Sequence, residues 1–310
     1  MTRLTLALTD LAPAADPASV PARAPALEGL LARAELRSVQ ALSWRHWLLE
    51  QAGIAVPDAP LPLAAMALAR REPLAFATPV HLVAGMDRVY LGTGGLLELE
   101  AAERAELAQG FEATFGGGRG LPFGFIALAT DDEVVTHDPA NLAGRDAGEW
   151  LPSGRGGAAL RLLMTEIQMW LHDHPVNARR ATRGLREVNS LWLWGTGSLE
   201  HWPKGRPRSR LCCSDPALLG WWRQAGGDIG SASPEATRLA DAVSLSSLSA
   251  DPNEAISLLD ERVAAPLAAA LAEGRYESVE LFAAGRVFAL TARQRWRLWR
   301  RSRPWWESLA

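Results

Sequence analysis

The densest group of chemically versatile residues lies between Glu166 and Gly197, in the segment EIQMWLHDHPVNARRATRGLREVNSLWLWGTG. Clustered arginines can hold an anion through paired hydrogen bonds, and asparagines are typical of hydrogen-bonded turns. The segment therefore predicts a ligand-binding site formed by these residues: His174, Asn177, Arg179, Arg183, Asn189 and Trp194. A second interpretation stays open, in which the histidine and asparagines bond the backbone of a structural turn and the arginines are solvated.

The two histidines of this segment do not suit a metal clamp on a helix. His172 and His174 are two residues apart, a spacing that points them to different helical faces. Pro175 favours an extended backbone at the residue before it. We therefore expect His174 to lie in a loop.

Hydrophobic periodicity indicates the elements that position this segment. A helix over 158–174 precedes it, and a buried strand over 190–194 ends it. Elsewhere the patterns predict further strands and helices, with Ser43 as a helix N-cap and a hairpin around 284–285; the strands are 2–9, 74–84, 88–92, 123–130, 276–283 and 286–290, and the helices 25–34, 44–52, 99–115 and 253–272. This alternation predicts an α/β fold.

Proline-rich stretches near 57–62 and 203–207 suggest the domain boundaries. We expect a discontinuous α/β core, residues 1–80 plus 205–310, with an inserted subdomain, residues 81–204. The inserted subdomain carries the polar segment. Asp10 is expected to follow a central parallel strand.

Composition narrows the function classes. The chain has 310 residues and a formal charge of −3, so nucleic-acid or membrane binding is not expected. It has no apolar run long enough for a membrane span. Its two cysteines, Cys212 and Cys213, are adjacent and predict no disulfide framework. A reducing, cytoplasmic location follows.

The segment HPVNARRATRGLREVNSLWLWGTG, residues 174–197, resembles the HPVN…R…G…N…WG.G signature of archaeal-type, cofactor-independent phosphoglycerate mutases of the alkaline phosphatase superfamily. Residues 24–30 and 256–271 resemble other helices of that superfamily more weakly. With PVHL at 79–82 and EIQMWLHDHPVN at 166–177, the chain is more closely similar to a bacterial phosphoglycerate-mutase-like family, also described as regulators of pathogenicity factors, the E-type protein. The resemblance implies a degenerate alkaline-phosphatase-like parallel-sheet core with an inserted α+β subdomain.

The resemblance also implies a site. These mutases use two divalent metals and a transiently phosphorylated serine. Asp10 stands at the first-strand metal position, and Ser43 stands where the nucleophile does, although Ser43 is equally a helix cap. The family's metal pair needs histidines near the C-terminus, whereas none of the six histidines follows His201.

We therefore expect a catalytically degenerate protein with a regulatory role or a small phosphorylated metabolite as its ligand. No cofactor is expected, and Mn²⁺ or Mg²⁺ would bind only if the metal site were intact. An active metal-dependent phosphoglycerate mutase or phosphatase is an open alternative. The sequence identifies no protein partner.

The C-terminal segment 293–306, RQRWRLWRRSRPWW, carries a different alternative. Arginine interleaved with tryptophan suits phosphates, a membrane surface, stacked bases or a protein partner, which would make the chain an interaction protein. Otherwise the segment is a terminal helix with Trp296 and Trp299 docked on the core and its arginines in water.

Overall fold

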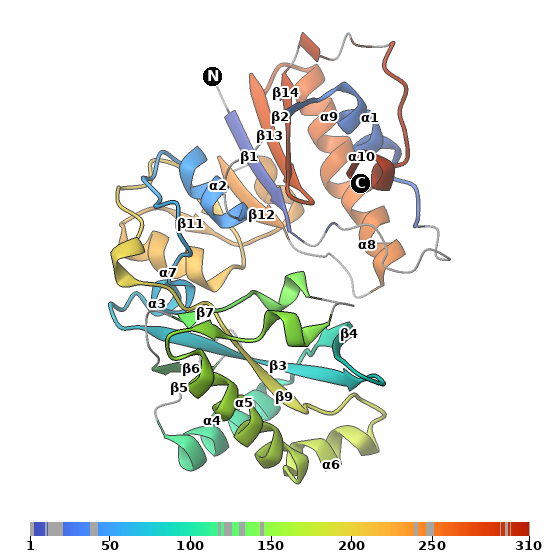
Figure 1. Ribbon diagram of the computed structural model, residues 1–310. Helices are drawn as coiled ribbons and strands as arrows, with labels where there is room; N and C mark the ends of the chain where they lie inside the picture. Colours follow the sequence, from blue (N-terminus) through green and yellow to red (C-terminus); the bar gives the residue numbers. More distant parts are fainter. Residues whose placement is uncertain are drawn as a thin grey trace. The chain divides into compact units, whose positions relative to one another are not determined.

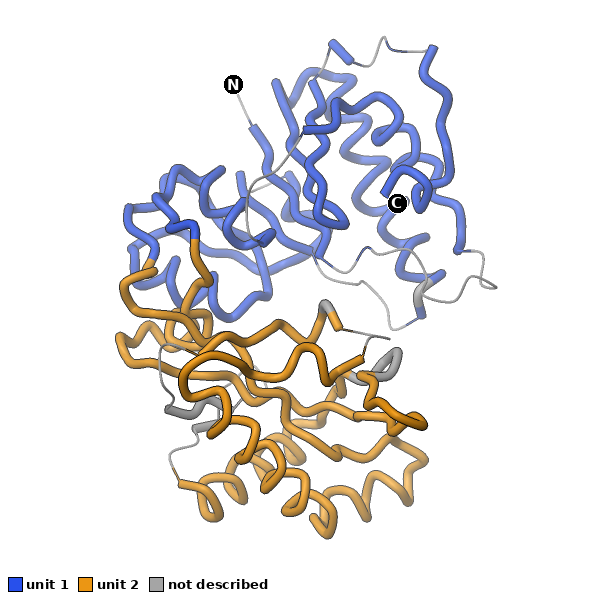
Figure 2. The backbone as a smooth tube through the Cα atoms, viewed as in Figure 1, with its two compact units in different colours: residues 1–58, 203–310 blue, residues 59–202 orange. Residues whose placement is uncertain are grey.

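The computed structural model describes residues 3–9, 11, 21–37, 43–116, 119–120, 126–129, 134–142, 146–238, 241–245, 251–291, 293–294, 297 and 299–309. The chain divides into unit 1, residues 1–58 with 203–310, and unit 2, residues 59–202 (Figure 2). The first boundary thus lies at 58/59 and not at 80/81. The reason is that β3 (Leu74–Ala84) is one continuous strand that belongs wholly to unit 2.

Unit 1 is built on a seven-stranded sheet of order β11-β10-β12-β1-β13-β14-β2 (Figure 1). β1 lies inside the sheet, parallel to both β12 and β13, so the prediction of a central parallel first strand is confirmed. β14 and β2 close one edge with antiparallel pairing. The strands are β1 Arg3–Leu8, β2 Glu35–Arg37, β10 Leu211–Cys212, β11 Ile229–Gly230, β12 Ala242–Leu245, β13 Ser278–Ala283 and β14 Arg286–Thr291.

Local sequence explains these strands well. β1 is buried on both faces after Arg3, as expected for a strand inside a parallel sheet. The turn between β13 and β14 places Ala284 and Gly285 at positive φ, 47° and 75°. Two positive φ values are what a tight two-residue hairpin requires, and the predicted hairpin is confirmed.

Helices pack against this sheet: α1 Pro25–Arg33, α2 Trp44–Gln51, α7 Pro216–Gln224, α8 Pro252–Leu259, α9 Ala265–Ala272 and α10 Trp305–Leu309, with the 3-10 turn η4 Pro234–Arg238. The single helix predicted over 253–272 is α8 and α9 joined by a π-helical turn, η5 (Asp260–Ala264). The Asp260 carboxylate accepts hydrogen bonds from the backbone N–H groups of Ala26 and Leu27. It thereby satisfies free donors at the start of α1.

Unit 2 has an antiparallel sheet of order β4-β3-β6-β5, with β9 also paired to β3, and a separate β7–β8 pair. Its strands are β3, β4 Val89–Leu96, β5 Arg119–Gly120, β6 Ile126–Ala129, β7 Val134–Val135, β8 Ser153–Gly154 and β9 Ser190–Trp194. Its helices are α3 Leu63–Leu68, α4 Ala101–Phe115, α5 Gly157–His172 and α6 Pro175–Thr182, with the 3-10 turns η1 Pro139–Asn141, η2 Ala147–Trp150 and η3 Leu199–His201.

The predicted fold class is confirmed: a largely parallel α/β core interrupted by an α+β unit. None of the helices in the described ranges is both long and apolar enough to cross a membrane.

Two local predictions are wrong. The polar turn after His174 contains a helix, α6, because Pro175 at its first position has the φ that a helix start needs. Trp299 does not dock on the core, since 75% of its surface is exposed. Trp296 lies outside the described residues. The arginines beside it are not all in water, because Arg297 and Arg300 donate to backbone oxygens at the end of α1.

Candidate functional site

Asn177 lies on α6, and its carboxamide is fully used inside unit 2. Its Nδ2 donates to the backbone oxygens of Leu171 and Val188, each at 2.9 Å, and its Oδ1 accepts from the Val188 N–H at 2.8 Å. The side chain is buried. Asn177 therefore pairs with the backbone of Val188 as a neighbouring strand would.

Asn189, the residue after Val188, also uses its carboxamide to bond the backbone of another segment. Its Oδ1 accepts from the Leu82 N–H at 2.8 Å, and its Nδ2 donates to the Leu82 oxygen at 2.7 Å. Leu82 lies in β3 just beyond the residues that pair with β9. The side chain thus continues the β3–β9 ladder where β9 has not yet begun.

His174 has the extended backbone predicted for a residue before proline, with φ −71° and ψ 132°, and lies in the short link between α5 and α6, where it is the N-cap of α6. Its Nδ1 accepts a hydrogen bond from the Val176 N–H at 3.2 Å, which places the ring proton on Nε2. Its ring packs edge-on against Trp170, with centroids 4.7 Å apart. Burial lowers the pKa of His174 from 6.5, with a further lowering from Arg179 and an opposing effect of Glu106.

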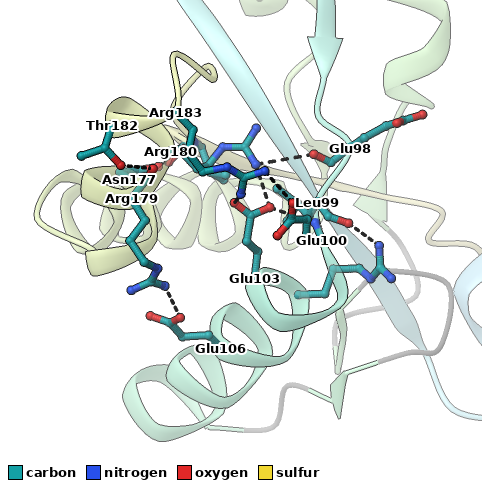
Figure 3. Close-up of polar contacts among 12 residues, drawn as sticks. Glu98, Leu99, Glu100, Glu103, Glu106, Asn177, Arg179, Arg180, Thr182 and Arg183 are labelled. Carbon is teal, nitrogen blue, oxygen red and sulfur yellow. Dashed lines mark hydrogen bonds and ion pairs between the residues drawn. The ribbon is translucent and has the colours of Figure 1, made fainter.

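The arginines of α6 and its C-terminal end face α4 (Figure 3). Arg180 is buried, with its NH1 2.9 Å from Glu103 Oε2 and its Nε donating to the Arg186 oxygen at 2.6 Å. Glu103 also accepts from the Glu100 N–H at 2.8 Å, which completes a capping box at the start of α4. One carboxylate therefore serves both the helix cap and the buried ion pair.

The two arginines predicted to bind a ligand also pair with glutamates of α4 and its N-cap. Arg179 pairs with Glu106, and Arg183 NH2 lies 2.5 Å from Glu100 Oε1 (Figure 3). Both pairs are substantially exposed. Sequence reasoning missed the glutamate partners, although a signal was present. Glutamates spaced three apart on one helix match arginines spaced within one turn of another.

Trp194 is buried, and its indole Nε1 donates to Thr78 Oγ1 at 2.7 Å across the β3–β9 pair. Its neighbour Trp192 donates to the His137 oxygen at 2.9 Å. Both indole donors are therefore satisfied within unit 2. All six predicted ligand-binding residues lie in unit 2, and each makes an intramolecular polar contact there, but Trp194 lies at the opposite end of β9 from Asn189. Their ligand-binding role stays a prediction.

Unit 2 also contains a cavity of about 750 Å³ between the β3–β4 hairpin and α5. Arg88 and Arg161 contribute guanidinium groups to it, and Met164 and Trp192 contribute apolar surface. None of the six predicted ligand-binding residues lines it. The segment contributes only Gln168 and Trp192 to the lining of this cavity.

Ser43 caps α2 in unit 1, as predicted. Its Oγ accepts from the His46 N–H at 3.4 Å and lies 2.8 Å from His46 Nδ1. This reciprocal contact is that of a helix cap, and a role as nucleophile stays a prediction. Asp10 lies outside the described residues. Within the described ranges, no group of three or more His, Cys, Asp or Glu side chains is placed to hold a metal ion.

Both cysteines are buried in unit 1. Burial raises the pKa of the Cys213 thiol far above its usual value, and the nearby Asp215 carboxylate raises it further. Burial also raises the pKa of Cys212. Neither thiol is activated as a nucleophile, because nucleophilic cysteines need a lowered pKa.

Comparison with known proteins gives one consistent result. The chain is 30% identical over 110 residues to the 2,3-bisphosphoglycerate-independent phosphoglycerate mutase of Methanothrix thermoacetophila, covering 34% of this chain and 28% of that enzyme. It is 33% identical over 95 residues to the enzyme of the same name from Methanosarcina barkeri, covering 30% and 23%. The chain is similar to cofactor-independent phosphoglycerate mutases.

The match is partial. The aligned part spans less than a third of the length of either mutase. No protein-family model matches the chain. Among solved structures, it resembles the cofactor-independent phosphoglycerate mutase from Thermoplasma acidophilum with a TM-score of 0.39 and 17% identity, over 94% of this chain and 90% of that one. The PH0037 protein of Pyrococcus horikoshii gives a TM-score of 0.45 and 15% identity, over 90% and 81%.

Proposed function

We propose that this chain is a phosphoglycerate-mutase-like protein with a degenerate alkaline-phosphatase-like core, which binds a small phosphorylated metabolite and acts in regulation without mutase turnover. We place it with the bacterial phosphoglycerate-mutase-like, E-type proteins and in the cytoplasm. The partial similarity to archaeal mutases supports the relationship. The distribution of histidines, none of which follows His201, supports the loss of turnover.

One structural observation carries the proposal. The arginines predicted to hold phosphoryl oxygens in unit 2 are already paired with carboxylates, Arg179 with Glu106 and Arg183 with Glu100. A guanidinium that has a carboxylate partner of its own has lost most of its attraction for a second anion. The segment that resembles the mutase signature therefore supports the architecture of unit 2 and leaves ligand binding to other surfaces.

An activity assay tests the loss of turnover. The full chain is incubated with 3-phosphoglycerate in the presence of Mn²⁺ or Mg²⁺, and formation of 2-phosphoglycerate is followed by a coupled assay. We expect no turnover above that of a buffer control. Turnover that disappears in Ser43→Ala and Asp10→Ala would overturn the proposal and make the chain an active metal-dependent mutase.

A ligand screen tests the binding role. Thermal shifts are measured with 3-phosphoglycerate, 2-phosphoglycerate and other small phosphate esters, each against its unphosphorylated analogue. A ligand that binds only the folded chain raises its stability by RT ln(1 + [L]/Kd). We expect at least one phosphate ester to raise the melting temperature while its analogue does not.

A second candidate function rests on Trp299. Its side chain is 75% exposed, and the guanidinium-bearing Arg301 and Arg303 next to it are exposed as well. Exposed tryptophan and arginine are the residue types that dominate protein–protein hot spots. This segment would then dock an acidic protein partner. Loss of that partner in Trp299→Ala, with unchanged stability, would support the interaction role.

A further inference from the structure

A cavity of about 390 Å³ lies at the amino-terminal ends of β1 and β12 in unit 1. Arg3 and Thr5 contribute from β1, Gln51 from α2, and Arg208 from the segment before β10. The cavity lies at the opposite end of the strands from the carboxyl end of β1. Asp10 follows that carboxyl end in the sequence. The cavity is therefore separate from the position where the mutase resemblance places catalysis.

The Arg3 side of this cavity carries a net positive charge. Arg3 NH2 donates to Gln51 Oε1 at 2.6 Å and lies 2.8 Å from Glu280 Oε1. Arg37 NH1 lies 2.8 Å from the same carboxylate oxygen. Two guanidinium groups thus share one buried carboxylate, so the three side chains together carry a net charge of +1. The shared contact also fixes the position of Arg3 at the cavity.

Arg208 provides the second charge. It is exposed, and it forms no hydrogen bond or ion pair with any residue of the described ranges. It belongs to a stretch with a basic residue at every second position, Lys204, Arg206, Arg208 and Arg210. Of these four residues, only Arg208 lines the cavity.

The other residues that line the cavity determine which chemical groups, besides phosphate, the ligand can carry. Asp241 lines the cavity and offers carboxylate oxygens, which accept hydrogen bonds from hydroxyl groups. Ser209 lines it as well, and its hydroxyl oxygen has no hydrogen-bond partner among the described residues. A volume of this size lies within the range of small-ligand sites.

We propose that this cavity binds a small phosphorylated hydroxy acid or polyol, with its phosphate between Arg3 and Arg208 and a hydroxyl group on Asp241. The proposal rests on the proposed function, because it names the site of the phosphorylated metabolite. It places that site in unit 1, away from the signature segment. Two guanidinium groups that converge on one anion form the charge-assisted contacts that phosphate recognition uses.

Isothermal titration calorimetry of the full chain tests the site. The probes are 3-phosphoglycerate, glycerate and inorganic phosphate, at constant ionic strength. The variants are Arg208→Gln and the matched control Arg206→Gln, which removes an equal charge two residues away outside the cavity. We expect 3-phosphoglycerate affinity to fall about tenfold or more in Arg208→Gln, about 1.4 kcal/mol, and to change less than about twofold in Arg206→Gln. Glycerate should not bind.

Each other outcome has a distinct meaning. If 3-phosphoglycerate binds wild type and Arg208→Gln equally, the cavity is the wrong site, while the proposed function stands. If only inorganic phosphate binds, and Arg208→Gln abolishes that binding, the cavity is an anion site and the proposed metabolite role fails. If neither 3-phosphoglycerate nor inorganic phosphate releases heat with wild type, both proposals fail.

Discussion

Replacing Asn177 by alanine should destabilise unit 2 strongly. The carboxamide makes three buried hydrogen bonds, two donated to the oxygens of Leu171 and Val188 and one accepted from the Val188 N–H. Alanine removes the partner of the Val188 carbonyl and of the Val188 N–H in the interior, and it leaves the Leu171 oxygen with only the His174 N–H, at 3.1 Å. At about 1 kcal/mol or more for each bond, the free energy of unfolding should fall by about 3 kcal/mol.

Differential scanning calorimetry of the full chain measures this loss. For a unit of this size, each kcal/mol lowers the melting temperature by about 2–4 °C, so the expected decrease is about 6–12 °C. Asn189→Ala is the matched comparison. Its two bonds to Leu82 are only partly buried, so water can replace the lost carboxamide, and the decrease should be smaller.

Asn177→Asp sharpens the test. The carboxylate can still accept from the Val188 N–H, but it faces two carbonyl oxygens without a hydrogen to donate. It should therefore be at least as destabilising as alanine. If either variant melts within about 2 °C of wild type, less than 1 kcal/mol is at stake, and the view of Asn177 as a structural clamp is wrong.

Three further predictions concern an ion pair of unit 2, a titrating helix cap and the two buried cysteines. Glu103→Gln keeps the helix cap but leaves the buried Arg180 guanidinium without a charged partner, so the free energy of unfolding in urea should fall by about 3 kcal/mol. The control Glu106→Gln removes a partner from an exposed pair and should lower it by less than about 1 kcal/mol. Because burial lowers the pKa of His174, its neutral form is favoured by folding. The stability that it contributes is therefore present above pH 6.5, the usual value, and is lost as the pH falls below it; His174→Asn, which caps the helix without titrating, should reduce that loss in melting curves at pH 7.5 and 5.5. Iodoacetamide at pH 8 should leave Cys212 and Cys213 unmodified in the folded chain and alkylate both in urea, since burial raises both pKa values; rapid labelling of the native chain would contradict their burial.

The sequence by itself determined features that depend on neighbouring residues. Strand β1, the β13–β14 hairpin and the Ser43 cap of α2 were all predicted, because each depends on residues that lie within a few positions of one another in the sequence. The same holds for the α/β class, which follows from the order of strands and helices. Helix α6 was missed because Pro175 fits both a turn and the first position of a helix.

The intramolecular partners of the polar segment were decided only by the tertiary structure. A guanidinium or a carboxamide offers the same donors to a ligand as to the protein, so its residue type does not reveal its partner. The partners of Arg180 and Asn189 are Glu103 and Leu82, 77 and 107 residues away in the chain. Contacts at that separation depend on how α4, α6 and β3 pack, and no local pattern encodes that packing.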